Sequence, residues 1–506
     1  MSLRFVLFRL LVLVTALTVV LTGAAAAALA APAAGAGAAE LDPAALDAYI
    51  AAQMAKHGLP GVALAVTRGT DVVVLKAYGT AGAGRPLTPQ TPMYIGSQSK
   101  SFTALAVAQL AEQGLVDVQA PVQTYLPWFR VAEAEASARI TVSHLLHHTS
   151  GLSESGFLAV LPDAAGIEDL TRALASARLT APVGAKFQYF NYGYDVLAAI
   201  VEAVSGQSYE RYLQEHILDP LGLTRTYTDP AAAQAAGLAQ GYSRFFGFVV
   251  PRAQPHRRYE IAAGYIMSTA EDLARYAIAL NNDTVYGQAR LLEPGGLQRL
   301  FRPVQGYGWG WFVESGHLYH GGANETFKTF VDLYPAQRLG IVLLINEGYL
   351  LDHYLSAEQV FAGVQAIVLG GPPPAVEAGW SVPVLGWLLL AFVLALGAFQ
   401  TFNVIALRGW RERARAWSPA RRAWDVAVSF LIPSVILAVV FWQVQGFFGY
   451  RFNLTYQLRT MGDTLPDISL LCLLGTVPDY AQGVVKLIWL VGSGHPSRLA
   501  AVEVKP

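Results

Sequence analysis

The chain has 506 residues, of which 54% are hydrophobic, and its mean hydropathy is +0.37. This length accommodates one large domain plus an appendage, and the apolar content is unusual for an ordinary soluble protein. The formal net charge is −1, which argues against a nucleic-acid-binding protein. Cys472 is the single cysteine, so an intramolecular disulfide is excluded.

Residues 1–39 predict a secretory signal peptide. Arg4 and Arg9 supply a basic start, an apolar stretch follows at 10–21, and the Ala-rich tract up to Ala39 offers small-residue cleavage sites. The alternative is an uncleaved N-terminal anchor. Either interpretation places the domain that follows outside the cytoplasm.

A predicted strand hairpin over residues 61–77 precedes a segment that contains Ser97 and Lys100. A helix is expected to begin near Ser97. Residues at i and i+3 share a helix face, so the lysine Nζ can reach the serine Oγ. Burial behind the apolar residues 102–110 would lower the lysine pKa and let it take the serine proton. The alternative is a helix-capping serine and a solvated lysine.

Tyr189 and Asn191 lie between a Pro/Gly turn and a predicted amphipathic helix. A phenol in this position can relay protons, and a carboxamide can hydrogen-bond a substrate amide. The alternatives are a packed aromatic residue and a helix cap.

Residues 316–346 predict three successive strands, the last at 339–346. His320, Gly322 and Ala323 belong to the stretch HGGA in the first of these strands. Glycine inside a strand often marks the close approach of another backbone or a ligand. We therefore expect the histidine to face a cleft and the Ala323 N–H to donate to an oxyanion. The alternative is a hairpin bulge with a surface histidine.

In this order and spacing, the three motifs resemble those of the serine β-lactamase/penicillin-binding-protein superfamily. The class C β-lactamase-like branch, which includes D-alanyl-D-alanine carboxypeptidases, D-aminopeptidases and esterases, is the most similar. Further matches are found at 140–152, 191–227 and 262–276, and the resemblance covers roughly residues 42–366. It implies an α+β, β-lactamase/transpeptidase-like fold: an antiparallel sheet flanked by helices, plus a helical subdomain. Strands at both ends and helices between them also fit this architecture.

The resemblance also implies roles for the motif residues. Ser97 would be the acylated nucleophile, Lys100 its proton partner, and Tyr189 the general base or leaving-group acid. The oxyanion would be bound by the backbone N–H groups of Ser97 and Ala323. The substrate-binding residues would be Asn191, His320 and Gly322.

No metal or cofactor is expected. His144, His147 and His148 suggest a metal site, but they fall in a loop that the family uses structurally. Glu154, Asp195 and Asp332 are likewise expected to be structural.

His320 stands where β-lactamases and carboxypeptidases usually carry lysine. A histidine is mostly neutral near pH 7, so the substitution weakens both of those assignments and favours neutral esters or amides as substrates. If His320 is protonated at lower pH, carboxylate-bearing substrates should improve as the pH falls.

The hydrolase domain is expected to span residues 40–366 and to be followed by a Pro-rich linker at 367–379. A transmembrane region is then expected at 380–491, with a tail at 492–506. Two spans are expected, at 382–406 and 426–444, and each is long enough to cross a bilayer. A third, 468–491, contains Pro478, Asp479 and Lys486, so crossing and interfacial placement both remain open.

The loop at 408–422 holds six arginines, which predicts a cytoplasmic location for it. The expected protein is therefore a multi-pass cell-membrane protein with an extracytoplasmic hydrolase domain.

The leading hypothesis is a membrane-anchored serine hydrolase that acts through an acyl-enzyme on a peptide or ester. One alternative is a penicillin-interactive D,D-carboxypeptidase or β-lactamase, and another is a non-catalytic membrane sensor or scaffold. The expected partners are the lipid bilayer and a small-molecule or peptide substrate, with cell-wall-derived molecules among the candidates. Substrate identity and oligomeric state are left open by the sequence.

Overall fold

The computed structural model describes residues 41–157, 161–349, 356–376, 381–448 and 466–492. The predicted signal peptide at 1–39 lies outside these ranges. The described residues fall into two compact units, one running to residue 383 and the other starting at residue 384. Each unit is described by itself.

A seven-stranded sheet forms the centre of the first unit, in the order β10-β11-β12-β13-β1-β2-β3, and its pairs are antiparallel. β1 pairs with β13, with Val62 opposite Ile345, so the two ends of the unit meet in one sheet. The predicted hairpin and the three predicted strands are thereby confirmed. The strand bounds are β1 Gly61–Arg68, β2 Asp71–Gly82, β3 Arg85–Pro86, β10 Phe312–Glu314, β11 His317–Ala323, β12 Lys328–Tyr334 and β13 Leu339–Ile345.

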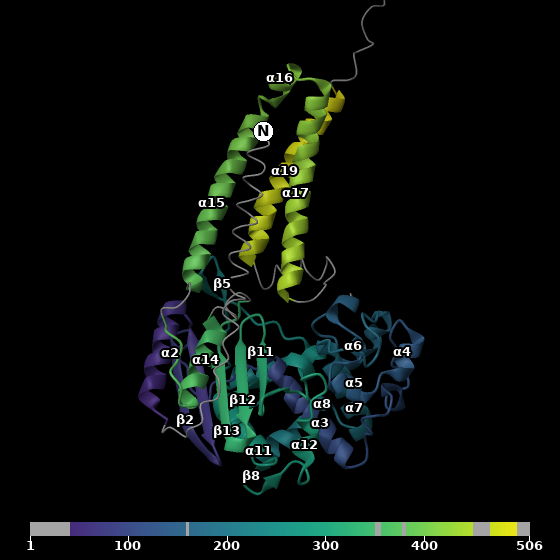
Figure 1. Cartoon of the computed structure of the whole chain (residues 1–506), viewed down its shortest axis with the longest axis vertical. Coiled ribbons are helices and arrows are strands. Elements are labelled where there is room, and N and C mark those ends of the chain that lie inside the picture. The colour runs from purple at the N-terminus through teal and green to yellow at the C-terminus, as the bar shows by residue number, and fades with distance from the viewer. Residues whose placement is uncertain (1–40, 158–160, 350–355, 377–380, 449–465, 493–506) are drawn as a thin grey trace, which may run out of the picture. The chain divides into compact units, whose positions relative to one another are not determined.

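Helices cover both faces of this sheet. α2 (Pro43–His57) and α14 (Glu358–Val368) pack on one face through Leu46, Ile50 and Val364 (Figure 1). α11 (Ala270–Asn281) packs on β1 and β13 from the other face. Because β1 and β13 are covered on both sides, their sequences are continuous apolar runs and do not alternate.

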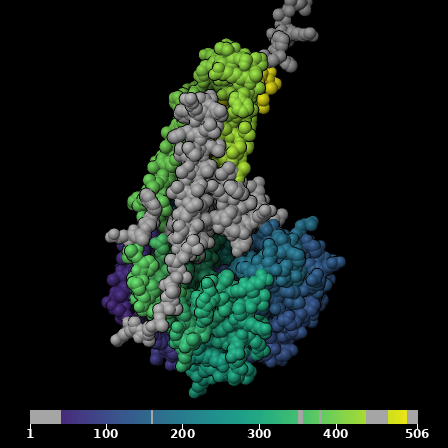
Figure 2. Space-filling model, viewed as in Figure 1, coloured from purple at the N-terminus to yellow at the C-terminus, as the bar shows by residue number. Residues whose placement is uncertain are grey.

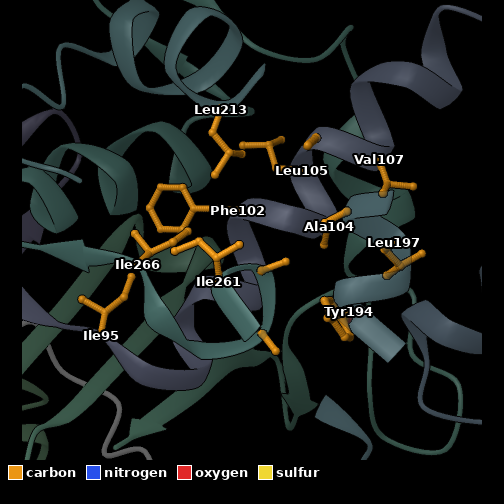
Figure 3. Close-up of a cluster of buried hydrophobic side chains, with 14 of the residues drawn as sticks. Ile95, Phe102, Ala104, Leu105, Val107, Tyr194, Leu197, Leu213, Ile261 and Ile266 are labelled. Carbon is orange, nitrogen blue, oxygen red and sulfur yellow. The ribbon is translucent and has the colours of Figure 1, made fainter. Parts of the chain in front are cut away.

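A helical subdomain lies between β3 and β10 in the chain. Its central element is α3 (Ser99–Glu112), in which residues 99–110 are all buried. Figure 3 shows Phe102 and Leu105 of α3 directed toward Leu213, and Val107 on the side of Leu197. A helix that is buried all round positions its N-terminus rigidly. The other α-helices of this part are α4 Ala134–Arg139, α5 Val142–Leu146, α6 Ile167–Ala173, α7 Asn191–Ser205, α8 Tyr209–Leu213, α9 Asp219–Leu221, α10 Pro230–Ala235 and α12 Gly296–Leu300.

Short elements complete this unit. Figure 2 shows blue residues of the helical subdomain beside teal and green residues that come later in the chain. The short strands are β4 Met93–Tyr94, β5 Tyr242–Phe245, β6 Phe248–Pro251, β7 Met267–Ser268, β8 Val285–Tyr286 and β9 Ala289–Arg290. A 3-10 turn, η1 (Gly96–Gln98), leads directly into α3.

The second unit is helical, and its helices cover the predicted transmembrane segments. They are α15 Val382–Leu407, α16 Trp410–Arg415, α17 Pro419–Phe448 and α19 Pro466–Gly492. Within the described ranges, α15 alone is long and apolar enough to be a candidate membrane span, with a mean hydropathy of 2.4 over its most apolar 18 residues. The predicted spans at 426–444 and 468–491 are helical, but their crossing of a membrane stays a prediction.

Lys486, a charge that interrupts the third predicted span, is paired inside the second unit. Its Nζ lies 2.8 Å from Asp425 Oδ2, and Trp410 Nε1 donates to the same oxygen at 2.9 Å. Pairing lowers the cost of placing such a charge in an apolar environment.

Candidate active site

Ser97 and Lys100 are brought together by the turn η1 and the first turn of α3. Lys100 Nζ lies 3.1 Å from Ser97 Oγ, as the i,i+3 spacing predicts. Ser97 is partly exposed, whereas the lysine is completely buried. The arrangement provides a hydroxyl that a substrate can reach and an amine that water cannot.

Two neighbouring serines have structural roles. Ser99 Oγ donates to the Gly96 carbonyl at 2.8 Å and accepts from the Ile266 N–H at 3.2 Å. Ser101 Oγ donates to the Gln98 carbonyl at 2.9 Å. Both serines are buried, so Ser97 is the accessible hydroxyl of this segment.

Lys100 has two further partners, and both can only accept hydrogen bonds. They are Asn191 Oδ1 at 2.8 Å and the Ala263 carbonyl oxygen at 2.6 Å. Burial lowers the pKa of Lys100 to about 7, although Asp195 and Glu154 oppose this shift. A neutral amine has two N–H groups, which these acceptors occupy, so its lone pair is left for the Ser97 hydroxyl. The geometry suits an amine that takes the serine proton.

Tyr189 lies beside the lysine. Lys100 Nζ is 4.9 Å from the centroid of the Tyr189 ring, and the ring is partly exposed. The ring also packs against His148, with the two centroids 4.3 Å apart. The phenol is therefore close to the reactive pair, while its role in proton transfer stays a prediction.

Asn191 is the first residue of α7, and Phe190 is the N-cap, so the alternative of Asn191 as a helix cap is wrong. Its side-chain Nδ2 donates to Glu154 Oε1 at 3.1 Å, and its backbone N–H donates to the same oxygen at 3.0 Å. The carboxamide oxygen is then directed toward Lys100.

His320 lies on β11 and is buried, so the alternative of a surface histidine is wrong. Its Nδ1 is 2.7 Å from the Gly321 carbonyl oxygen, which can only accept, so Nδ1 carries the proton. Nε2 then accepts from the Tyr307 hydroxyl at 3.0 Å. Burial, with a contribution from the Lys100 charge, lowers the pKa of His320 to about 3.

The improvement with carboxylate-bearing substrates at lower pH is conditional on protonation of His320, and burial disfavours that condition. The neutral form of the ring is favoured because it is desolvated and lies near a second basic group. His320 adjoins the site through its ring, whose centroid is 6.4 Å from that of Tyr189.

The glycines of β11 allow this strand to approach η1. A Cβ on Gly322 would overlap the Ile95 carbonyl oxygen, and a Cβ on Gly96 would lie 2.5 Å from the Ala323 nitrogen. Gly96 also has a φ of 53°, which favours glycine. The Ala323 nitrogen is thus close to the turn that carries Ser97, as an oxyanion-binding pair requires.

The three histidines of residues 140–152 have structural partners. His144 completes a capping box with Thr141 at the start of α5, and His147 Nδ1 lies 2.9 Å from the Ser143 carbonyl oxygen. His148 Nδ1 accepts from the Phe190 N–H at 3.2 Å. In the described part of the chain, no three His, Cys, Asp or Glu side chains are grouped as a metal site.

The family model described as Beta-lactamase matches residues 46–364 of this chain. The chain belongs to the Beta-lactamase family. Protein flp of Staphylococcus aureus (strain MW2) is 28% identical to it over 310 residues, which cover 60% of this chain and 62% of that protein. The putative penicillin-binding protein PbpX of Bacillus subtilis (strain 168) is 29% identical over 57% of this chain and 71% of its own length.

Solved structures show the same Beta-lactamase-type fold. The octameric penicillin-binding protein homologue from Pyrococcus abyssi has a TM-score of 0.58 and 27% identity, and the match covers 66% of this chain and 78% of that chain. FmtA from Staphylococcus aureus has a TM-score of 0.55 at 21% identity over 65% and 90% of the two chains, which supports the fold alone. The predicted fold class is confirmed, and the family supports a serine-hydrolase type of function.

Two acidic residues of this Beta-lactamase family member were missed as part of the site. Glu154 holds Asn191, and Asp195 Oδ1 accepts from the Ala263 N–H at 3.2 Å. Neither belongs to a catalytic motif, and both contact Lys100 only through a third residue. The one available signal is that buried acids are rare unless they have polar partners, but burial is not readable from the sequence.

Proposed function

We propose that this chain is a serine hydrolase that forms an acyl-enzyme on Ser97 and acts on a peptide or ester substrate. The observation that carries the proposal is Lys100, which is completely buried, lies 3.1 Å from Ser97 Oγ and has a pKa lowered to about 7. Neutral amine is therefore available near neutral pH, as a general base requires.

In this mechanism, Ser97 Oγ attacks the substrate carbonyl carbon while its proton moves to Lys100 Nζ. The carbonyl oxygen gains the negative charge and accepts hydrogen bonds from the backbone N–H groups of Ser97 and Ala323. Tyr189 passes a proton to the leaving amine or alcohol as the bond from carbon to that group breaks. Water then attacks the acyl carbon, the bond from that carbon to Ser97 Oγ breaks, and a proton from the water reaches Oγ through Lys100 and Tyr189, which releases the acid and restores the serine hydroxyl.

We further propose that the hydrolase domain is extracytoplasmic and anchored to a membrane. α15 supports the anchor, because its length of 26 residues and the mean hydropathy of 2.4 over its most apolar 18 residues suit a single span. The six arginines of residues 408–422 support a cytoplasmic location for the loop after that span.

A penicillin-interactive carboxypeptidase or β-lactamase is the second candidate, favoured by the names of the Bacillus and Pyrococcus relatives. A neutral His320 provides no positive charge for the carboxylate that β-lactams and terminal D-alanine carry. We therefore place neutral esters and amides first.

Intact-protein mass spectrometry with a fluorophosphonate probe tests the proposal. One adduct is expected on Ser97, absent in Ser97→Ala and formed far more slowly in Lys100→Ala. A screen of esters, D-amino-acid amides, peptides and β-lactams on the same protein then identifies the substrate class. An adduct on Ser99 or Ser101, or turnover by Ser97→Ala, would contradict the mechanism, and a stable adduct without turnover of any substrate would favour a sensor.

A further inference from the structure

The orientation of the Asn191 carboxamide is decided by Glu154. The oxygen and nitrogen of a carboxamide occupy nearly the same space, so a flip of the side chain is sterically easy. The flipped form would direct an N–H group at Lys100, which is itself a donor. Glu154 prevents this, because its Oε1 accepts from Nδ2 at 3.1 Å and from the Asn191 backbone N–H at 3.0 Å.

The position of Glu154 is fixed by the surrounding fold. It is the first residue of a short 3-10 turn, η3 (Glu154–Gly156), and the residue is buried, with 7% of its surface exposed. The turn is held to residue 178, because the Arg178 N–H donates to the Gly156 carbonyl at 2.8 Å. A carboxylate held in this way can only accept hydrogen bonds, so it selects one of the two carboxamide orientations.

We propose that Glu154 is a positioning residue for acylation: it holds the Asn191 carboxamide with Oδ1 toward Lys100 and so directs the lysine lone pair at Ser97. The inference rests on the proposed function, because it assigns a role within that mechanism. Glu154 does not touch the substrate and acts through Asn191.

Glu154 also affects the charge of Lys100. Its negative charge and that of Asp195 raise the lysine pKa against the larger effect of burial. Acylation needs the neutral amine, so its rate increases as the pH rises through the lysine pKa. Removing the Glu154 charge should lower the pKa of Lys100, so the acylation rate should begin to increase at a lower pH. The titratable groups around Lys100 are Glu154 of η3, Tyr194 and Asp195 of α7, Glu260 of η6 (Arg258–Glu260), Tyr189, His148 and His320.

The experiment measures the rate of Ser97 labelling by a fluorophosphonate as a function of pH, in the full-length protein. In Glu154→Ala the carboxamide can flip, and the rate should fall about ten- to a hundredfold. In Glu154→Gln the introduced amide oxygen still accepts from Asn191, so the labelling rate should fall by less than in Glu154→Ala. The pH at which the labelling rate increases should move to a lower value, because the Glu154 charge is gone. Asp332→Asn, which alters a buried acid between β12 and α14, is the matched control and should keep the wild-type profile.

A double exchange separates positioning from a loss of folding. In Asn191→Asp alone, two carboxylates face each other and labelling should be slow. In the double variant Glu154→Gln/Asn191→Asp, the introduced amide donates to the introduced carboxylate, which still accepts from Lys100. Labelling should then be at least about tenfold faster than in Asn191→Asp. The pH at which the labelling rate increases should be higher than in Glu154→Gln.

Three results would overturn the inference. If the wild type is labelled at Ser97 but the double variant is no faster than Asn191→Asp, Glu154 does not position the carboxamide. If Glu154→Ala keeps the wild-type rate and profile, the same conclusion follows and the proposed function stands. If the wild type is not labelled at Ser97, the proposed function fails and the inference fails with it.

Discussion

At the residue scale, the proposed chemistry depends on Lys100, because its environment decides whether it can act as a base. Its aliphatic chain is enclosed within the helical subdomain and its Nζ contacts Ser97, Asn191 and Ala263. Such a group is charged below its pKa and neutral above it. The lowered pKa therefore sets the pH range in which Ser97 can be activated.

We expect the rate of Ser97 acylation to increase with pH up to about 7 and to level off above it. Below that point the rate should fall about tenfold per pH unit, because only the neutral amine takes the proton. Lys100→Arg keeps the positive charge but cannot act as a base, so its rate should be ~10²–10⁴ lower. Labelling with a fluorophosphonate between about pH 5 and 9 measures this profile. A rate that is independent of pH across this range would show that the lysine is not the base.

Specificity should depend on His320. His320→Lys introduces a positive charge and should raise the ratio of β-lactam to neutral-ester kcat/KM about ten- to a hundredfold, the value of a charge-assisted hydrogen bond. Steady-state kinetics with one β-lactam and one ester measure the ratio. His317→Lys, the same exchange on the same strand, is the control. Efficient penicillin turnover by the wild type would mean that another residue sets specificity.

At the element scale, the site depends on the contact between β11 and η1. The strand reaches the turn because Gly322 lacks a side chain, and the sheet holds the strand in register through β12, with Gly322 opposite Thr329. The helix α3 fixes the other side of the contact, since its buried residues hold the Ser97 turn in place.

Gly322→Ala should therefore reduce kcat strongly. Its Cβ would push β11 away from Ile95, and the loss of one oxyanion donor costs roughly 10²–10³ in kcat. Gly321→Ala is the matched control, because its Cβ would meet only the Thr329 carbonyl oxygen at 3.8 Å, an ordinary contact. Ester hydrolysis by the two variants is compared with their thermal unfolding midpoints. Equal activity of the two variants would show that the Ala323 N–H does not stabilise the oxyanion.

For the whole molecule, a unit with the Beta-lactamase-type fold is followed in the chain by a helical unit that contains one strongly apolar helix. α17 and α19 pack closely together within the helical unit, and Lys486 and Asp425 pair between them. The membrane topology of these helices is a prediction that rests on arginine distribution and segment length.

Cysteine accessibility in intact cells tests this topology, in a Cys472→Ser background. Gln337 and Ser418 are both exposed, so cysteines introduced there can react. Gln337→Cys should react with an impermeant maleimide, and Ser418→Cys should react only after permeabilisation, because the arginine-rich loop is expected inside. The reverse pattern would invert the topology, and equal labelling of both would place α15 outside the membrane.

The sequence by itself determined the features that depend on near neighbours in the chain. The Ser97–Lys100 contact follows from helix geometry at i,i+3, and the apolar run at 339–345 already indicates a fully buried strand. The family resemblance, carried by local motifs, predicted the fold class for the same reason.

Only the tertiary structure decided features that depend on distant segments and on burial. Val62 faces Ile345 across the sheet, and Glu154 reaches Asn191 across a gap of 37 residues. Folding removes water from the His320 ring and from the Lys100 amine, and this desolvation lowers the pKa of both groups. Desolvation belongs to the packed environment and not to the residue, so no local pattern in the sequence could predict it.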